Sequence, residues 1–280
     1  MSSVGKRPLL EDDCGVFHVI HNRCPSEEAF APMSVPDLAR HRLFIDRAFA
    51  VQAVLPLERE QANYLLNVLR LKAGDGVLVF NGRDGEWLAN VVPEGRKQAG
   101  LALLRRVREQ PPAPDLHYLF APLKHARLDY MAQKAVEMGA GLLQPVITRR
   151  TQVSRLNLDR MRANAVEAAE QCGLLALPEV APEQPLEAAL AGLSPDRLLV
   201  FCDEAMEQAS PVAALTAHKP APLAVLIGPE GGFDEAERQL IRARPNTLSL
   251  SLGPRILRAD TAAVAALSLV QAVLGDWPRP

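Results

Sequence analysis

The second part of the chain alternates apolar runs of strand length with segments of helical period. Strands that alternate with helices form parallel sheets, because a parallel crossover needs a long connection that is usually a helix. Uninterrupted apolar runs such as LAVLI at 223–227 predict strands that are buried on both faces. We therefore expect an α/β domain over residues 113–280. The expected strands begin at residues 116, 142, 198, 223 and 248, and the expected helices span 128–140, 155–172 and 261–274.

The first part of the chain follows a different pattern. Between residues 40 and 112, short β-prone runs are separated by turn-forming sequences such as KAGDG and NGRDG. One segment, 61–71, carries apolar residues at helical spacing. Several short strands with one helix predict a small β-barrel. The proline-rich spacer PPAPD at 111–115 marks the boundary between the two domains.

The distribution of charge separates the same two parts. The formal net charge of the whole chain is -2, yet residues 40–112 hold twelve basic and eight acidic side chains. A basic surplus inside a nearly neutral chain marks the barrel as a separate module.

Residues 1–39 show neither a helical nor a strand period, so we expect a poorly ordered extension, with Met33 as a candidate true start. The cysteines and histidines between Cys14 and Cys24 lack the paired spacing of zinc ligands, and we expect no metal site. Four scattered cysteines favour a reducing cytoplasm over a disulfide framework. No apolar run approaches the roughly 18 residues of a membrane span, and acidic residues interrupt any secretory leader.

A glycine-rich loop, GPEGGF at 228–233, follows one of the buried strands. Open α/β sheets bind ligands at the carboxyl ends of their strands. The Gly231-Gly232 pair permits close approach of a ligand to the backbone, and Asp234 with Glu237 predicts a capped helix. Neither a lysine nor a G-x-G-x-x-G spacing is present for a phosphate, so the loop favours an uncharged or cationic ligand. The alternative is a strand-to-helix turn without a ligand.

A second loop, LGPRILRADTAA at 252–263, follows the last expected strand. Ile256 and Leu257 are apolar residues in an expected connection, and Arg255 and Arg258 flank them. Apolar walls with a few polar anchors are typical of a small-molecule site. In the alternative interpretation, Ile256 and Leu257 are ordinary core residues and the arginines are solvated.

Other reaction classes find little support in the sequence. The motifs G-x-S-x-G, Walker A and H-E-x-x-H are all absent. Cys172 and Cys202 have no neighbouring histidine, so we expect inert, partly buried thiols.

Five motifs together resemble one family. The two loops, with VLRLKAGDGVLVFNG, QKAVEMGA and EAAEQCG, are similar to the RsmE family of ribosomal RNA uracil-N3 methyltransferases, which belongs to the SPOUT superfamily. The similarity covers about residues 40–276 and matches in order across both domains.

The resemblance implies a PUA-like barrel that binds RNA, followed by a SPOUT α/β domain with a C-terminal trefoil knot around S-adenosylmethionine. It also implies a homodimer to which the C-terminal helix contributes. The cofactor-binding residues that it implies are Leu226, Ile227, Gly228, Glu230, Gly231, Gly232, Leu252, Gly253, Ile256, Leu257, Arg258, Thr261 and Ala262.

The implied reaction is methylation of N3 of a uridine in 16S ribosomal RNA, on a base that must be unpaired because pairing buries N3. Arg258 is our candidate for stabilising the anionic base, and its alternative role is to contact the donor's carboxylate or a neighbouring subunit. No general base is assigned. The residues expected to contact RNA are Arg42, Arg70, Lys124, Arg127, Lys134, Arg149, Arg150 and Arg155, with Arg160 and Arg162 in the same arginine-rich segment.

Two positions depart from the family pattern. Leu174 stands where the family usually has arginine, and Asp260, our expected N-cap of the last helix, replaces a glutamate. Three rival functions remain at this point: a non-catalytic RNA-binding factor, a SPOUT methyltransferase acting on another RNA or another atom, and a nucleotide-dependent oxidoreductase, against which the missing G-x-G-x-x-G counts.

Overall fold

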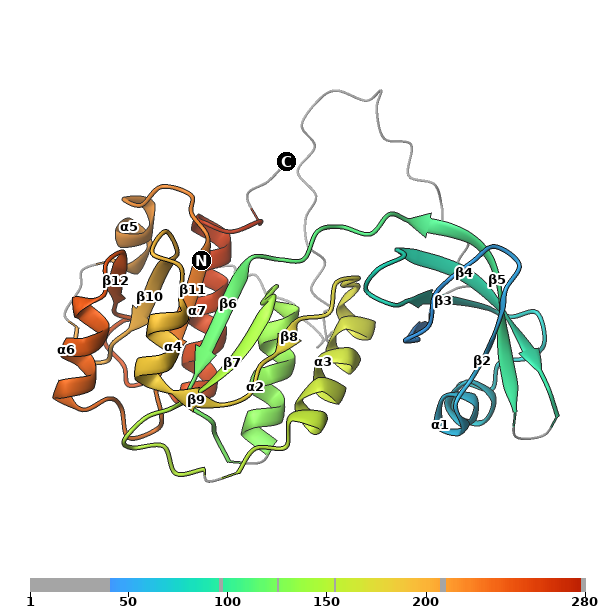
Figure 1. Cartoon of the computed structure of the whole chain (residues 1–280), viewed down its shortest axis with the longest axis horizontal. Coiled ribbons are helices and arrows are strands. Elements are labelled where there is room, and N and C mark those ends of the chain that lie inside the picture. The colour runs from blue at the N-terminus through green and yellow to red at the C-terminus, as the bar shows by residue number, and fades with distance from the viewer. Residues whose placement is uncertain (1–40, 96–97, 125, 154, 207–209, 278–280) are drawn as a thin grey trace, which may run out of the picture. The chain divides into compact units, whose positions relative to one another are not determined.

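The fold is described from a computed structural model, in residues 41–95, 98–124, 126–153, 155–206 and 210–277. The expectations for residues 1–39, including Met33 and the segment from Cys14 to Cys24, fall outside these ranges. Two separate sheets account for the strands of the described part (Figure 1). None of the helices in these ranges is long and apolar enough to cross a membrane.

The first sheet is five-stranded and curled, as expected for a PUA-like domain (Figure 1). Its strand order is β1-β3-β4-β5-β2, with β1 parallel to β3 and the remaining pairs antiparallel. Its elements are β1 (Arg42–Phe44), β2 (Val54–Pro56), α1 (Arg59–Asn63), η1 (Tyr64–Val68), β3 (Gly76–Phe80), β4 (Glu86–Pro93) and β5 (Ala99–Arg108). The single helix expected over 61–71 is wrong in detail, because a short α-helix passes into the π-helical turn η1, and the helix ends before Arg70 at a φ of 58°.

The second sheet is the parallel sheet that strand and helix alternation predicts. Its main order is β12-β10-β11-β6-β7-β8, and β9 pairs with β7. Its strands are β6 (Leu116–Phe120), β7 (Leu142–Ile147), β8 (Glu179–Val180), β9 (Gln184–Pro185), β10 (Leu198–Cys202), β11 (Leu223–Ile227) and β12 (Thr247–Leu250). Every residue of β10 and of β11 is buried, which confirms that their apolar runs lie inside.

Helices cover both faces of this parallel sheet. One face packs against α2 (Ala126–Glu137), α3 (Leu158–Cys172), α5 (Pro211–Thr216) and α7 (Ala259–Val273). The other face packs against α4 (Leu186–Gly192) and α6 (Glu235–Ala243). Figure 1 shows α4 and α6 on one side of the strands and α2, α3 and α7 on the other. The expected α/β architecture is therefore confirmed, whereas the expected knot stays a prediction.

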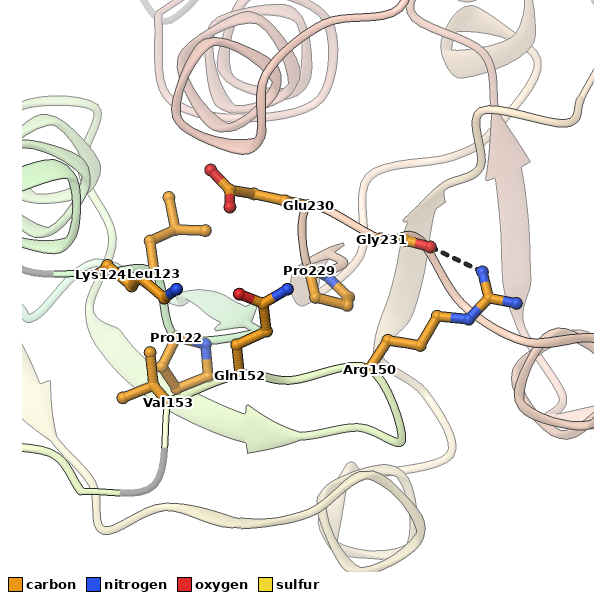
Figure 2. Close-up of a pocket in the computed structure, with 9 residues that line it drawn as sticks. All are labelled: Pro122, Leu123, Lys124, Arg150, Gln152, Val153, Pro229, Glu230 and Gly231. Carbon is orange, nitrogen blue, oxygen red and sulfur yellow. Dashed lines mark hydrogen bonds between the residues drawn. The ribbon is translucent and has the colours of Figure 1, made fainter.

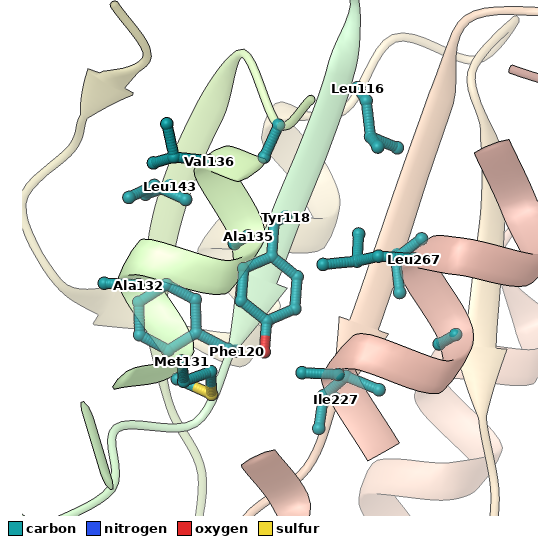
Figure 3. Close-up of a cluster of buried hydrophobic side chains, with 14 of the residues drawn as sticks. Leu116, Tyr118, Phe120, Met131, Ala132, Ala135, Val136, Leu143, Ile227 and Leu267 are labelled. Carbon is teal, nitrogen blue, oxygen red and sulfur yellow. The ribbon is translucent and has the colours of Figure 1, made fainter. Parts of the chain in front are cut away.

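The larger core lies between the sheet and the helices of the first face. Tyr118 and Phe120 of β6 stack at 5.0 Å between ring centroids, among Met131 of α2, Ile227 of β11 and Leu267 of α7 (Figure 3). Burial raises the pKa of Tyr118 well above its usual value. Since the strands beside these residues end at the pocket described below, this core fixes the floor of that pocket.

Some elements differ from the sequence expectations. The short helices α4 and α5 and the two-residue strands β8 and β9 were not predicted, since segments of this length carry little periodic signal. The last helix begins at Ala259 with Arg258 as its N-cap residue, so the expected cap at Asp260 is wrong. Asp260 instead lies in the first turn and accepts a hydrogen bond from the amide of Thr261 at 2.8 Å.

Candidate functional site

A pocket of about 1020 Å³ lies at the carboxyl ends of three neighbouring strands, β12, β10 and β11. Both predicted loops line it, so the structure brings them together as expected. The predicted residues that line it are Ile227, Gly228, Glu230, Gly231, Gly232, Leu252, Gly253, Ile256, Leu257, Arg258 and Ala262.

The structure does not place two of the predicted residues on this pocket. Leu226 is fully buried within β11, and Thr261 is exposed in the first turn of α7. Sequence analysis also missed a group of lining residues that follow β10. They are Asp203, Glu204 and Met206, together with Cys202, which is the last residue of β10. The run LLVFCDE carried the signal, because an acidic pair directly after a buried strand belongs to the same sheet edge as the two loops.

The GPEGGF loop packs tightly enough to require glycine. A Cβ at Gly228 would lie 2.5 Å from the ring of Phe233, which is itself buried against Phe201 at 5.3 Å. Gly232 has a φ of 67°, and a Cβ there would lie 2.2 Å from Oε1 of Glu204. The backbone of the loop therefore lines the pocket directly, and Glu204, in the segment after β10, packs against the loop at Gly232.

The helix that follows this loop begins with the predicted capping box. The amide of Glu237 donates to Asp234 at 2.8 Å, and the amide of Asp234 donates to Glu237 at 3.0 Å. Arg149 joins this turn, because its amide donates to Glu237 and its guanidinium to Asp234. The hydrogen bond from the backbone amide of Glu237 lowers the pKa of Asp234 below its usual value. The guanidinium of Arg149 acts in the same direction.

Two acidic residues after β10 are held by arginines of α6. Asp203 has a fully buried side chain that forms ion pairs with Arg242 and, at 3.4 Å, with Arg238. Arg238 also donates to Oε1 of Glu204 at 2.6 Å. Glu204 itself is about half exposed, at 48%. The arginines are one helical turn apart on α6, so one helix face fixes the acidic wall of the pocket.

The second loop leaves apolar surface open to the pocket. Ile256 is 95% exposed, which rules out the alternative that it is a core residue. Leu257 is half-buried, and Arg255 and Arg258 are exposed. Ile256 and the half-buried Leu257 thus give this wall of the pocket apolar surface that a ligand can contact.

Cys202, a buried residue at the end of β10, also lines this pocket. Burial raises the pKa of Cys202 to about 12, with the charge of Asp203 acting in the same direction. The thiol is therefore neutral and inert near neutral pH, as expected. Cys172, in contrast, is exposed, so the expectation that it is partly buried is wrong.

A second, much smaller pocket lies along the same sheet edge, beyond β6 and β7. Figure 2 shows its lining, with Gln152 between Leu123 and Pro229. Arg150 donates to the carbonyl oxygen of Gly231 at 2.6 Å, which ties the segment after β7 to the GPEGGF loop. The two pockets share Pro229, Glu230 and Gly231.

Arg42 has a different environment from the one expected for an RNA contact. Its side chain is only 12% exposed, and its guanidinium donates to Glu86 at 2.7 Å. It also donates to the backbone carbonyls of Ala169, Glu170 and Leu174 at the end of α3. These contacts occupy the guanidinium, so Arg42 is not among the RNA-binding residues proposed below.

Several of the other predicted RNA-binding cations form ion pairs on the surface. Arg127 pairs with Glu230, Lys134 with Glu137, and Arg160 with Asp129, while Arg162 pairs with Asp159. Lys124, Arg70 and Arg155 are exposed, and the structure gives them no ion pair with another described residue. Exposed pairs contribute little to stability, so phosphate groups can compete for the paired cations.

The chain matches known proteins over both sheets. Residues 109–271 match the RNA methyltransferase domain family, and residues 57–103 match the RNA methyltransferase PUA domain. Ribosomal RNA small subunit methyltransferase E from Synechocystis is 33% identical over 84% of this chain and 78% of its own length. The chain belongs to the ribosomal RNA small subunit methyltransferase E family.

Solved structures of similar proteins share the fold of this family member. The methyltransferase E of Neisseria gonorrhoeae, bound to S-adenosylmethionine, is 25% identical with a TM-score of 0.76, and the match covers 85% of this chain and 99% of that one. A methyltransferase from Legionella pneumophila in complex with S-adenosylmethionine is 29% identical with a TM-score of 0.72, over 82% and 96% of the two chains. Both matches cover more than four fifths of this chain, so they extend over the curled sheet and the parallel sheet.

Proposed function

We propose that the protein transfers a methyl group from S-adenosylmethionine to N3 of a specific uridine in 16S ribosomal RNA of the small subunit. The observation that carries this proposal is the pocket in which the GPEGGF loop meets the second loop, residues 252–263. The two similar structures that hold S-adenosylmethionine support the choice of methyl donor. The family name supports the small-subunit RNA as substrate.

The chemistry of the pocket fits this cofactor. Ile227, Leu252 and Leu257 offer apolar surface for an adenine ring. The amino-acid part of the cofactor carries an ammonium and a carboxylate, and the pocket lining supplies both carboxylates and guanidinium groups. Gly231 and Gly232 line the pocket without side chains, so a ligand can approach their backbone. The residues that we propose to hold the cofactor are the predicted ones that line the pocket.

Bound S-adenosylmethionine supplies an electrophilic methyl group, so the chain itself needs no nucleophile. The remaining work is to orient an unpaired uracil, exclude water and stabilise the negative charge that develops when N3 loses its proton. We assign that stabilisation to Arg258, an exposed residue of the pocket wall at the start of α7. A guanidinium beside the uracil oxygens would stabilise the anionic base as its charge develops.

The substitution Arg258→Ala separates the two roles considered for this residue. If Arg258 stabilises the anionic base, kcat falls by about 100-fold, as for other single electrostatic groups, while the Kd for S-adenosylmethionine stays unchanged. If Arg258 instead binds the carboxylate of the donor, calorimetry finds the loss in that Kd.

We propose that RNA phosphates contact Arg70, Lys124, Arg127, Lys134, Arg149, Arg150 and Arg155. Arg155→Glu tests this surface most cleanly, since its guanidinium forms no ion pair with a described residue that the change would break. We expect a higher KM for RNA and a weaker salt dependence, with unchanged affinity for the cofactor. Lys219→Glu is the matched control, because Lys219 is exposed and precedes β11, at the opposite edge of the sheet. Equal effects of both changes would remove Arg155 from the interface.

We also propose that the protein is a cytoplasmic homodimer with α7 at the subunit contact, as the family resemblance implies. The partly exposed apolar residues Ala262, Leu269 and Val273 on α7 support this helix as the contact. Light scattering of the purified chain tests the assembly, and a monomer at micromolar concentration would refute it.

The decisive experiment incubates the full chain with labelled donor and small ribosomal subunits that lack native modification. Mass spectrometry then maps the methylated nucleotide. We expect a single uridine methylated on its base at N3. Label on a ribose, or in another RNA, would refute the proposed specificity.

A further inference from the structure

We propose that Glu204 binds the α-ammonium group of the methyl donor and so selects ligands that carry an amino-acid part. This inference rests on the proposed function, since it assigns a residue to one end of the proposed cofactor. Neither the sequence motifs nor the family resemblance includes Glu204.

Glu204 lies on the pocket wall formed by the chain after β10. Arg238, which is only 17% exposed, donates to its Oε1 atom. The second oxygen, Oε2, forms no hydrogen bond to a residue in the described ranges, and the side chain is 48% exposed. Arg238 thus orients the carboxylate while one oxygen remains free to accept from a ligand.

The other carboxylates of the pocket are less suitable for this role. Asp203 has no exposed side-chain surface and is bound by both arginines of α6. Glu230 pairs with Arg127 across a more solvent-exposed contact, in which the two side chains are 47% and 39% exposed. Glu204 therefore combines a positioning partner that is mostly shielded from solvent with an oxygen that no described residue occupies.

The position of Glu204 against the glycine loop adds a second argument. Its Oε1 atom occupies the space that a Cβ of Gly232 would need. The carboxylate consequently lies beside a backbone turn that a ligand can approach closely, at the junction of two strand ends. A ligand group that contacts the Gly231-Gly232 turn comes within reach of this carboxylate.

The ammonium is the better partner for a carboxylate than the sulfonium of the same molecule. The sulfonium loses its positive charge as the methyl group leaves, so a carboxylate beside it would stabilise the ground state more than the transition state. The ammonium keeps its charge throughout the reaction. A carboxylate on the ammonium therefore adds binding energy without raising the barrier.

The test compares three ligands by calorimetry on the full-length chain. S-adenosylmethionine and S-adenosylhomocysteine both carry the ammonium, whereas 5′-methylthioadenosine lacks the amino-acid part. In Glu204→Gln the amide oxygen still accepts from Arg238, but the free position no longer carries charge. We expect the first two ligands to bind about 10- to 100-fold more weakly, and 5′-methylthioadenosine to bind as it does to the unaltered protein.

Each other outcome overturns the inference. Equal losses for all three ligands would show that Glu204 only shapes the loop. A loss for S-adenosylmethionine alone would place the carboxylate at the sulfonium, and a selective loss in Glu230→Gln but not in Glu204→Gln would move the ammonium to Glu230. Glu235→Gln, an exposed change on α6 outside the pocket lining, is the matched control. Failure of the unaltered protein to bind S-adenosylmethionine would instead refute the proposed function.

Discussion

The pair of substitutions Gly232→Ala and Gly231→Ala tests the pocket geometry most directly. At Gly232 the backbone has a φ of 67°, and a Cβ would lie 2.2 Å from Oε1 of Glu204. At Gly231 a Cβ would lie 3.5 Å from two carbons of Arg150, which is ordinary van der Waals contact. Adjacent residues of one loop therefore face very different costs for the same added methyl group.

The expected cost at Gly232 has two parts. A left-handed alanine costs about 1–2 kcal/mol. Displacing Glu204 loses an ion pair with Arg238 that is half exposed, which is worth about 0–1 kcal/mol after solvent screening. Together they predict a loss of about 2 kcal/mol in the free energy of unfolding, against less than about 0.5 kcal/mol for Gly231→Ala.

Thermal unfolding of both variants measures this difference. A loss of about 2 kcal/mol lowers Tm by roughly 4 to 8 °C in a chain of this size class. The double variant Gly232→Ala with Glu204→Ala removes the clash, so its loss should be smaller than the sum of the two single losses. Equal Tm values for Gly231→Ala and Gly232→Ala would refute the reasoning.

Three further predictions concern other parts of the chain. Arg42→Ala should lower the free energy of unfolding, measured by urea denaturation, by about 2–4 kcal/mol, because it removes charged hydrogen bonds to the end of α3. The control Arg47→Ala, at an exposed residue, should change it by less than about 0.5 kcal/mol, and similar values for the two variants would contradict the contacts described. Because burial raises the pKa of Cys202 to about 12, iodoacetamide should label exposed Cys172 first, and mass mapping that finds equal rates would show an accessible thiolate at Cys202. The pKa of Asp234 is lowered in the folded state, so its negative charge stabilises the fold above the usual pKa of 3.8, and this stabilisation is lost as pH falls through the lowered value. The Tm difference between the unaltered protein and Asp234→Asn should therefore shrink below pH 3.8. A Tm difference that does not change with pH would exclude this cause.

The meeting of the two loops could be predicted because it follows from a topological rule. Carboxyl ends of parallel strands lie at one edge, so any two buried strands followed by unusual loops direct those loops to one place. The same rule would have found Asp203 and Glu204 if the acidic pair after β10 had been weighed as a third loop. The rule identifies the whole edge of the sheet, whereas motif similarity identified only the loops after β11 and β12 and not the segment after β10.

Charge and solvent exposure could not be predicted in the same way. Arg42 adds one positive charge to the basic module, but its guanidinium already donates hydrogen bonds to Glu86 and to backbone carbonyls. Nothing in local sequence indicates that partner, because the carbonyls lie more than a hundred positions along the chain. Leu174, where the family resemblance implies an arginine, packs against the larger core.

The strand order also has a consequence for how the protein is made. The central strand β6 pairs with β7 soon after it, but its other neighbour is β11, whose first residue is Leu223. While the ribosome is still synthesising the chain, that apolar edge of β6 has no native partner and can pair with other nascent chains. Slower translation should therefore lower the yield of folded protein, since this edge of β6 stays unpaired until β11 has emerged.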